Sequence, residues 1–431
     1  IFSLPLMLSN LLQVLFNMSD IAVVGRFAGS VALGAVGSTT IFVALFTGLL
    51  IGMGSGVNAL IARHIGAGDN ENVSSSCYAS ATVSFAAGIL IAALGIGLAK
   101  PLLQLLNTKS EFIDGAVLYV RIYFCGMPAL AVYNFGNGVL SADGDTKRPL
   151  IFLSFAGVLN IGLNLLFVIV FKMSVAGVAL ASIISQYLSA GLIIVALCRT
   201  KRPYRLNFRN FKLCRDKVKN VLILGVPAGL QNAIFAMANL FIQAGVNSFD
   251  AVMVEGNSAA ANADALIYNI MAAFYMACTS FMAQNLGAGK KDKLLKCYFI
   301  SLLYSFAISA VMSVVLVFLG KPFLSLFTTE QEVVNAGMKR LYIMGFSYAV
   351  SAFMDCTIAA SRGLGKTVIP TIIVIMGSCV FRIIWVYTVF AYFKTIPSLY
   401  LLYVFSWTIT AIAEIIYFVV AYRKIMKKHF Y

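Results

Sequence analysis

Long apolar runs separated by short polar connections fill the sequence from end to end. Each run reaches or exceeds the roughly 20 residues that an α-helix needs to cross a bilayer. Because the runs are continuous, they argue against a membrane β-barrel, whose strands alternate over about ten residues. The pattern predicts an all-α integral membrane protein with twelve transmembrane helices, placed near 2–24, 33–61, 74–98, 115–142, 149–171, 174–197, 221–250, 256–286, 294–319, 337–363, 367–393 and 398–422.

The second half of the chain repeats phrases of the first half at a nearly constant offset. "ARHIGAGD" at 62–69 returns 221 positions later as "AQNLGAGK", and "GDTKRP" at 144–149 returns as "GKTVIP". Six helices per half is an even number, so both halves start on the same side of the membrane and form parallel repeats around a central cavity. We expect an N-lobe at 1–198, a basic linker at 199–220 and a C-lobe at 221–431.

The distribution of charge orients these helices. Hydrophobic residues make up 61% of the chain and charged residues 11%, with a net charge of +16. The even-numbered connections and the C-terminal tail hold 22 of the 32 basic residues, the odd-numbered connections hold nine, and Arg382 stands inside a run. The positive-inside rule then predicts a multi-pass protein of the cell membrane with both termini and the linker in the cytoplasm. The basic surplus is a topology signal, so no nucleic-acid partner is expected.

Several kinds of chemistry have no support in the sequence. The eight cysteines are scattered without a CxxC pair, and there are only two histidines, so neither a metal site nor a disulfide is expected. "ASRGLGKT" approaches a phosphate-binding loop, but Ala360 replaces its first glycine and no strand precedes it. We therefore expect neither an enzyme nor an organic cofactor. The chain begins at Ile1 inside an apolar run, so its natural N-terminus is expected to lie upstream.

Polar residues inside the first run form a stripe. Asn10, Gln13, Asn17 and Asp20 are spaced by 3, 4 and 3 positions, which places them on one face of a helix. An ionisable group at membrane depth is costly and usually marks a transport pathway. The structural alternative is that the stripe joins neighbouring helices through hydrogen bonds. We favour a functional role for Asp20.

Further polar side chains interrupt the other runs. Asp355 is the repeat equivalent of Asn134, and it would attract a cationic substrate unless Arg382 pairs with it. Glu414 is expected to be structural, and Asp264 also fits the outer mouth of a cavity. Together these residues form a candidate set: Asn134, Asn137, Asn160, Asn164, Asp264, Asp355, Arg382 and Glu414.

The whole chain resembles the multidrug and toxic compound extrusion (MATE) family. The resemblance rests on "LPLMLSNLLQVLFNMSDIAVVGRFAG" in the first run, the duplicated "GAG" turns, "GVPAGLQNAIFAMANLFIQAGVNSF" opening the second half, and "SRGLGKTVIP". It implies secondary active efflux of organic, often cationic, compounds in exchange for H⁺ or Na⁺, by alternating access of the two lobes. The partners implied are small organic molecules and membrane lipids, and we expect a monomer.

The resemblance also implies site residues. One branch of the family couples ions through an Asp on helix 1 with an Asn and an Asp on helix 5; Asp20 and Asn160 match, but Asn164 replaces the second acid. The other branch uses carboxylates on helices 7 and 10, where Asp355 matches the latter and only Gln231 and Asn232 lie near the former. The predicted cation-coupling set is Asp20, Asn160, Asn164 and Asn17. The predicted substrate set is Asp355, Arg382, Asp264, Asn134, Asn137 and Gln231.

Two other function classes remain open at this stage. The first is a flippase for lipid-linked precursors within the same superfamily, which usually has a more basic cavity or extra helices. Here Arg382 alone would supply that charge. The second is a membrane enzyme or receptor, for which the sequence offers no catalytic grouping. Uptake of candidate substrates into proteoliposomes would separate the three classes.

Overall fold

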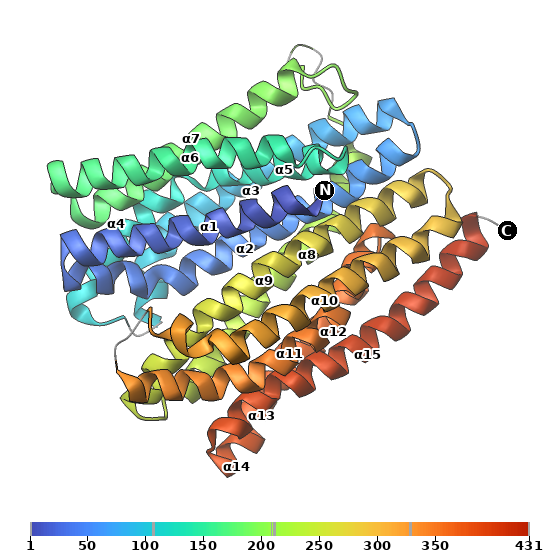
Figure 1. Cartoon of the computed structure of the whole chain (residues 1–431). Helices are drawn as coiled ribbons and strands as arrows, with labels where there is room; N and C mark the ends of the chain where they lie inside the picture. Colours follow the sequence, from blue (N-terminus) through green and yellow to red (C-terminus); the bar gives the residue numbers. More distant parts are fainter. Residues whose placement is uncertain (1, 106–107, 208, 210–212, 327–329, 430–431) are drawn as a thin grey trace. The chain divides into compact units, whose positions relative to one another are not determined.

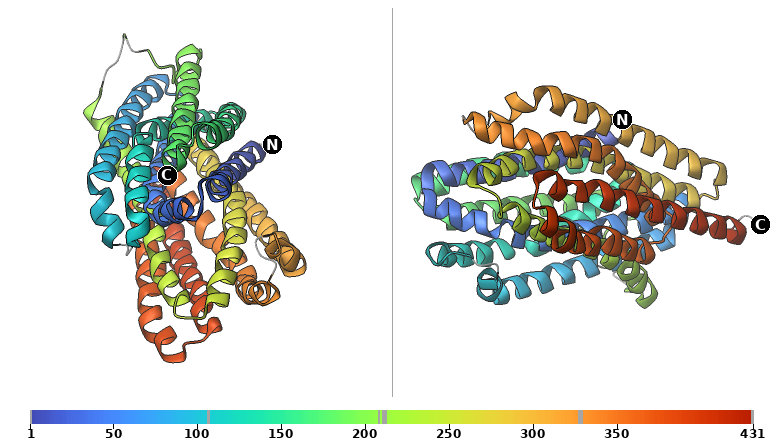
Figure 2. Two further views of the ribbon diagram at one scale, coloured as in Figure 1. Left: turned by 90° about the vertical axis from the view of Figure 1, so that its left-hand side faces the viewer. Right: turned by 90° about the horizontal axis from the view of Figure 1, so that it is seen from below.

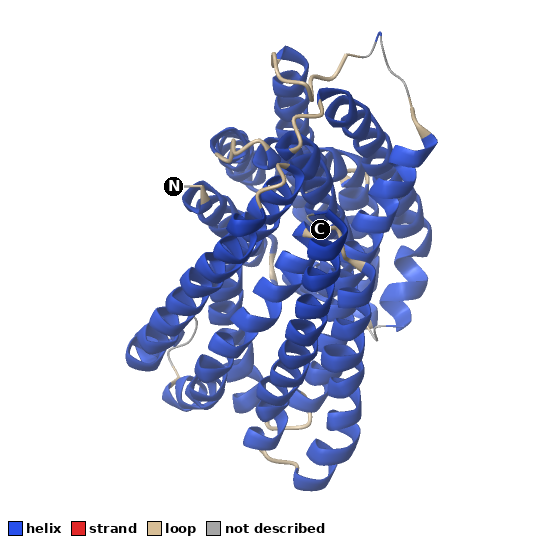
Figure 3. Ribbon diagram, turned by 90° about the vertical axis from the view of Figure 1, so that its right-hand side faces the viewer, coloured by secondary structure: helices blue, strands red, loops and turns tan. Residues whose placement is uncertain are grey.

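The computed structural model describes residues 2–105, 108–207, 209, 213–326 and 330–429. Within those residues the chain consists of helices and short connections, without strands (Figures 1 and 3). In this described part of the chain, eleven helices are long and apolar enough to cross a membrane, and a bent pair counted as one span makes twelve. This confirms the predicted fold class. The α-helices are α1 Ser3–Val23, α2 Ser30–Gly66, α3 Asn70–Leu105, α4 Ser110–Phe124, α5 Met127–Ala142, α6 Lys147–Leu165, α7 Ser174–Arg199, α8 Arg215–Val246, α9 Ala251–Gly287, α10 Lys291–Leu324, α11 Gln331–Gly363, α12 Val368–Val374, α13 Phe381–Trp385, α14 Ala391–Phe393 and α15 Ile396–His429.

Among the described residues, four short π-helical segments extend or interrupt these helices. Val24–Ala28 continues α1 and Leu166–Val170 continues α6. Ile375–Val380 and Val386–Phe390 join α12, α13 and α14 into one span, Val368–Phe393. A π-helical turn widens the helix locally and is frequent at functional sites.

One predicted helix is bent. The run at 115–142 forms α4 and α5, which meet at 47° instead of continuing straight. Pro128 stands in the first turn of α5. Proline has no N–H to donate to the preceding turn, so the helix ends before it and restarts.

The internal repeat is visible in the backbone. The ends of α2 and α9, the starts of α3 and α10, and the starts of α4 and α11 each lie 221 positions apart. Gly68 and Gly289 both have a φ of 68°, and Gly144 and Gly365 have φ of 94° and 76°. Glycine adopts this left-handed conformation without the steric cost of a Cβ. The repeated phrases are therefore turns that stop equivalent helices.

The chain packs as two compact units, residues 1–233 and 234–431. In each unit consecutive long helices run antiparallel (Figure 2). The first part of α8 belongs to the first unit, because Gly52 and Gly56 of α2 approach its backbone closely. A Cβ on Gly52 would lie 2.3 Å from the Ala228 carbonyl oxygen, and one on Gly56 would lie 2.6 Å from the Gly225 Cα. Small residues allow membrane helices to pack this closely.

The described part of the linker is anchored to the first unit. Tyr204 is buried, and its hydroxyl donates to the Asp143 carboxylate at 2.9 Å. Burial and the nearby Asp143 charge raise the pKa of Tyr204 well above its ordinary value, so the phenol stays a donor. The Cys77 thiol also donates to the Tyr204 carbonyl at 3.4 Å. The lobe boundaries at 198 and 221 stay a prediction.

The outward side chains are those of a membrane protein. Large apolar residues such as Phe155, Leu303 and Phe318 are 65%, 65% and 77% exposed. Buried polar residues are common, among them Asn58, Ser309 and Glu414, each at 0% exposure. Soluble proteins show the opposite distribution, with apolar side chains inside and polar side chains outside. A lipid environment requires the distribution seen here.

Candidate functional site

In the first unit the polar stripe of α1 leads to a network around Asp20. The Asp20 carboxylate is buried and accepts hydrogen bonds from the Asn164 amide and, at 3.1 Å, from the Ser182 hydroxyl. The Asn164 amide also donates to the Asn160 side-chain oxygen at 3.2 Å. Helices α1, α6 and α7 therefore meet at one carboxylate. The predicted residues Asp20, Asn160 and Asn164 come together as expected, and Ser182 is an addition.

A cavity of about 330 Å³ opens beside this carboxylate. That volume lies at the lower end of the range for small-molecule sites. Asn17 and Gln13 of the stripe line the cavity together with Asp20 and Asn160. Its wall mixes aromatic and polar side chains, which include Tyr119, Tyr123, Tyr133, Ser185, Gln186 and Ser189. The cavity can therefore hold an organic molecule, or water and an ion, against the carboxylate.

The charge of Asp20 is not neutralised by a base. Among the described residues no Lys, Arg or His lies within ion-pair distance of it. The Asn164 side-chain oxygen is buried and has no hydrogen-bond donor in the described part of the chain. Carboxylate and amide oxygens are the ligands that a hard cation prefers. The arrangement can hold a proton on Asp20 or a cation among these oxygens.

The other predicted amides of the first unit do not reach the cavity. Asn134 donates to the Leu130 carbonyl of its own helix at 2.9 Å. Asn137 accepts from the Ser141 hydroxyl at 3.3 Å. Gln231 is buried in the part of α8 that packs with the first unit. None of the three is among the residues that line the cavity described above.

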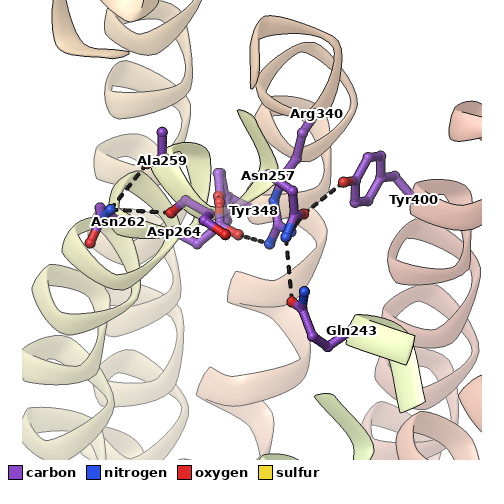
Figure 4. Close-up of polar contacts among 9 residues, drawn as sticks. Gln243, Asn257, Ala259, Asn262, Asp264, Arg340, Tyr348 and Tyr400 are labelled. Carbon is purple, nitrogen blue, oxygen red and sulfur yellow. Dashed lines mark hydrogen bonds and ion pairs between the residues drawn. The ribbon is translucent and has the colours of Figure 1, made fainter. Parts of the chain in front are cut away.

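In the second unit Asp264 belongs to a charge-balanced network (Figure 4). Its carboxylate accepts from the Arg340 guanidinium and from the Tyr348 hydroxyl. Arg340 also donates to the Asn257 side-chain oxygen, which accepts from the Tyr400 hydroxyl at 2.6 Å. The network ties α9, α11 and α15 together. Asp264, predicted as a substrate residue, thus has its charge compensated within the protein.

Asp355 and Arg382 do not form the ion pair considered from the sequence, because the described residues contain no such contact within 4.0 Å. The Arg382 side chain instead donates from Nε to Ser406 at 3.2 Å. Its guanidinium carbon lies 4.7 Å from the centre of the Tyr403 ring and 5.6 Å from that of Trp407. Aromatic faces attract a cation in this geometry. Asp355 is partly exposed on α11.

Sequence reasoning missed several participants. Ser182 and Gln186 carry no signal by themselves, because polar residues of this size are common in membrane helices. Arg340 is one of the nine basic residues that the sequence assigns to the odd-numbered connections, although Asn257 and Asp264 stand seven positions apart on one helix face and need a common donor. Glu414 was expected to be structural. It is fully buried, and neither of its carboxylate oxygens has a hydrogen-bond partner among the described residues.

Comparison with known families finds the same repeat. A family model described as MatE matches residues 5–166 and again residues 227–388. The probable multidrug resistance protein YpnP of Bacillus subtilis is 31% identical over 81% of this chain and 78% of its own length. A FAD transporter of Shewanella oneidensis is 24% identical over 77% of this chain and 74% of its own.

Solved structures show the same fold. One of them, the outward-facing conformation of a multidrug resistance MATE family transporter, superposes with a TM-score of 0.91. It is 22% identical in sequence, and the match covers 99% of this chain and 95% of the other. The two-repeat architecture predicted from the sequence is thus that of known transporters.

Proposed function

The chain belongs to the MatE family of membrane transporters, and from this premise we propose that it is a secondary active multidrug efflux transporter. It exports organic, chiefly cationic, compounds in exchange for H⁺ or Na⁺ by alternating access. The relatives are transporters, so the chain is not an enzyme. The coupling ion, the charge of the substrates and the transport cycle are part of the proposal.

The observation that carries this function is the uncompensated Asp20 carboxylate beside the cavity. A carboxylate that neutral donors alone hold can exchange a proton or a cation at modest cost. An internal arginine would have blocked that exchange. The absence of a second acid at Asn164 leaves a site with one negative charge, which suits one monovalent ion per cycle.

The cavity and the relatives suggest the substrate class. An aromatic and polar wall around a carboxylate favours amphiphilic cations through stacking and cation–π contacts. YpnP is described as a probable multidrug resistance protein, and the Shewanella oneidensis relative as a FAD transporter. A flavin dinucleotide is anionic, so it serves as the contrasting substrate in the test below.

We further propose a monomer in the cell membrane with both termini in the cytoplasm. The basic linker supports this orientation, because it carries nine Lys or Arg between Arg199 and Lys219. Cysteine labelling from each side of the membrane, applied to the linker, tests it. Labelling from the outer side alone would reverse the orientation.

The function is tested in proteoliposomes loaded with ethidium, with an imposed pH gradient or sodium gradient. We expect one of the two gradients to drive dye efflux, and we expect the same gradient to fail with Asp20→Asn. The matched control is Asp114→Asn, which changes an exposed acid of the same unit. Efflux of FAD but not of ethidium would overturn the cationic substrate class. Full gradient-driven efflux in Asp20→Asn would overturn the role of Asp20.

A further inference from the structure

Glu414 differs from every other glutamate of the chain. There are six glutamates, and five of them are exposed. Glu414 lies inside α15 with 0% exposure, and its two carboxylate oxygens have no hydrogen-bond partner among the described residues. A buried polar group normally has such a partner, so an exception asks for a specific explanation.

The packing of α15 explains why the carboxylate has no donor. The span that contains α12 and α13 runs antiparallel to α15 and bonds to it in a regular register. Arg382 pairs with Ser406 at 3.2 Å, and Ser378 pairs with Thr410 at 3.0 Å. One further turn in this register brings Glu414 opposite Val374, which is fully buried and apolar. The polar ladder therefore ends at Glu414 without a partner.

Charged groups do face Glu414, but from α11. Asp355 and Arg362 stand seven positions apart on that helix, about 10 Å along its axis. Glu414 interacts electrostatically with both of them. On α15 itself, Tyr417 also interacts electrostatically with Glu414. Helix α12 has no ionisable residue.

These surroundings allow Glu414 to hold a proton and to release it. An ionised carboxylate without a donor is costly in a low-dielectric interior, so the carboxyl is stable here in its neutral form. When the proton leaves for water, the charge that remains is balanced by Arg362 across the helix interface. Sodium is a poorer fit, because a hard cation needs several oxygen ligands and Val374 offers none.

We infer that Glu414 is a proton-exchange site of the second unit, separate from Asp20 in the first. This inference rests on the proposed function and deepens it, since it makes the second unit a participant in coupling. The repeat supports a division of roles. The positions of the first unit 221 and 222 residues before Glu414, Ile193 and Leu192, are apolar. The positions 221 and 222 residues after Asp20, Phe241 and Ile242, are apolar as well.

The test counts the protons released when ethidium binds to the full-length protein. Calorimetry in two buffers of different ionisation enthalpy gives this number directly. Because binding and proton release are linked reciprocally, we expect Glu414→Gln to release about one proton fewer than the wild type. Glu255→Gln, the same change at an exposed glutamate of the second unit, should release as many protons as the wild type. Unchanged proton release in Glu414→Gln would overturn the inference.

A second measurement does not depend on transport or on the stability of a variant. Infrared spectra of protein labelled with ¹³C-glutamate separate glutamate carboxyls from aspartate carboxyls. We expect a protonated glutamate band in the wild type near neutral pH. The band should vanish in alkali, and its absence throughout would overturn the inference. If ethidium neither binds nor is transported but the band titrates, the proposed function fails and the proton site stands.

Discussion

Asp20 in the first unit and Asp264 in the second are both acids within membrane helices, but their partners differ in charge. Asp20 accepts from an amide and a hydroxyl, which are neutral. Asp264 accepts from the Arg340 guanidinium and a phenol (Figure 4). A carboxylate with a permanent cation has no need of an ion from solution. The comparison indicates that charge balance, rather than burial alone, separates an exchangeable acid from a structural one.

The same criterion applies within the second unit. The charge of Asp264 is balanced by an ion pair with Arg340. Glu414 has electrostatic partners but no hydrogen-bond donor among the described residues. The second unit therefore combines a rigid polar network toward the start of α9 with an exchangeable acid in α15.

Removing the cation from the Asp264 network should have the largest effect. Arg340→Met leaves Asp264 partly buried without its counter-charge, and a broken buried ion pair costs about 3–5 kcal/mol. We expect a clearly lower thermal unfolding temperature in detergent. The double variant Arg340→Met with Asp264→Asn should recover most of the loss. Equal stability of the single and double variants would contradict the charge-balance argument.

The Arg382 cation–π contacts should come second. Arg382→Gln removes a cation held over Tyr403 and Trp407, worth about 2 kcal/mol when desolvated. Asp355→Asn should cost less, because no ion pair joins the two residues among those described. Thermal unfolding of both single variants and the double variant measures this. If Asp355→Asn lowers the stability and the added Arg382→Gln recovers it, the result would support an Asp355–Arg382 ion pair, as considered from the sequence.

Much of the fold could be predicted because it follows from periodic signals. The long apolar runs, the 221-residue offset and the glycine turns can all be read directly along the sequence, and the structure confirms the helices and the repeat they indicate. The bend at Pro128 could have been predicted from the proline itself, since proline interrupts the hydrogen bonds of a helix. The pattern of apolar residues could not reveal the bend, because the residues on both sides are equally apolar.

The sites were predictable only where their members share one helix or match a family pattern. Asp20, Asn160 and Asn164 are predicted in this way, and hydrogen bonds join them in the structure. Partners from separate helices were missed, because pairing Arg340 with Asp264 requires the rotation of α11 against α9. The carboxylate oxygens of Glu414 have no hydrogen-bond partner among the described residues, and this depends on how α15 packs against its neighbours, which no local pattern encodes.

The repeated turns offer a smaller test of the difference between the units. Asp69 directly precedes α3, and its carboxylate accepts from the Asn72 backbone N–H at 3.0 Å. Lys290 holds the equivalent position before α10 and makes no such cap. Lys290→Asp should therefore add about 1 kcal/mol of stability, the usual contribution of an N-cap. Thermal unfolding measures it, and a loss of stability would contradict the equivalence of the two turns.

The Asp69 cap also gives the sign of a pH effect. The Asn72 backbone and side-chain N–H groups lower the pKa of Asp69 below its ordinary value. A carboxylate of this kind stabilises the folded state above its unfolded pKa, and the contribution is lost as the pH falls through the lower, folded value. Asp69→Asn should weaken this acid dependence, whereas wild-type dependence in that variant would assign it to other groups.

Asp20→Asn should change stability least of all, and that outcome would sharpen the comparison most. The substituted amide keeps an oxygen to accept from Asn164 or Ser182, and its new NH₂ group can donate to the Asn164 oxygen, which otherwise lacks a donor. We expect the free energy of unfolding to stay within about 1 kcal/mol of the wild type, the size of one hydrogen bond. Ethidium binding should persist but lose its dependence on the coupling ion. Arg340→Met should show the reverse, with lower stability and an intact ion dependence in the protein that remains folded. Comparable destabilisation in both variants would mean that Asp20 is a structural acid like Asp264, and charge balance would no longer separate the two units.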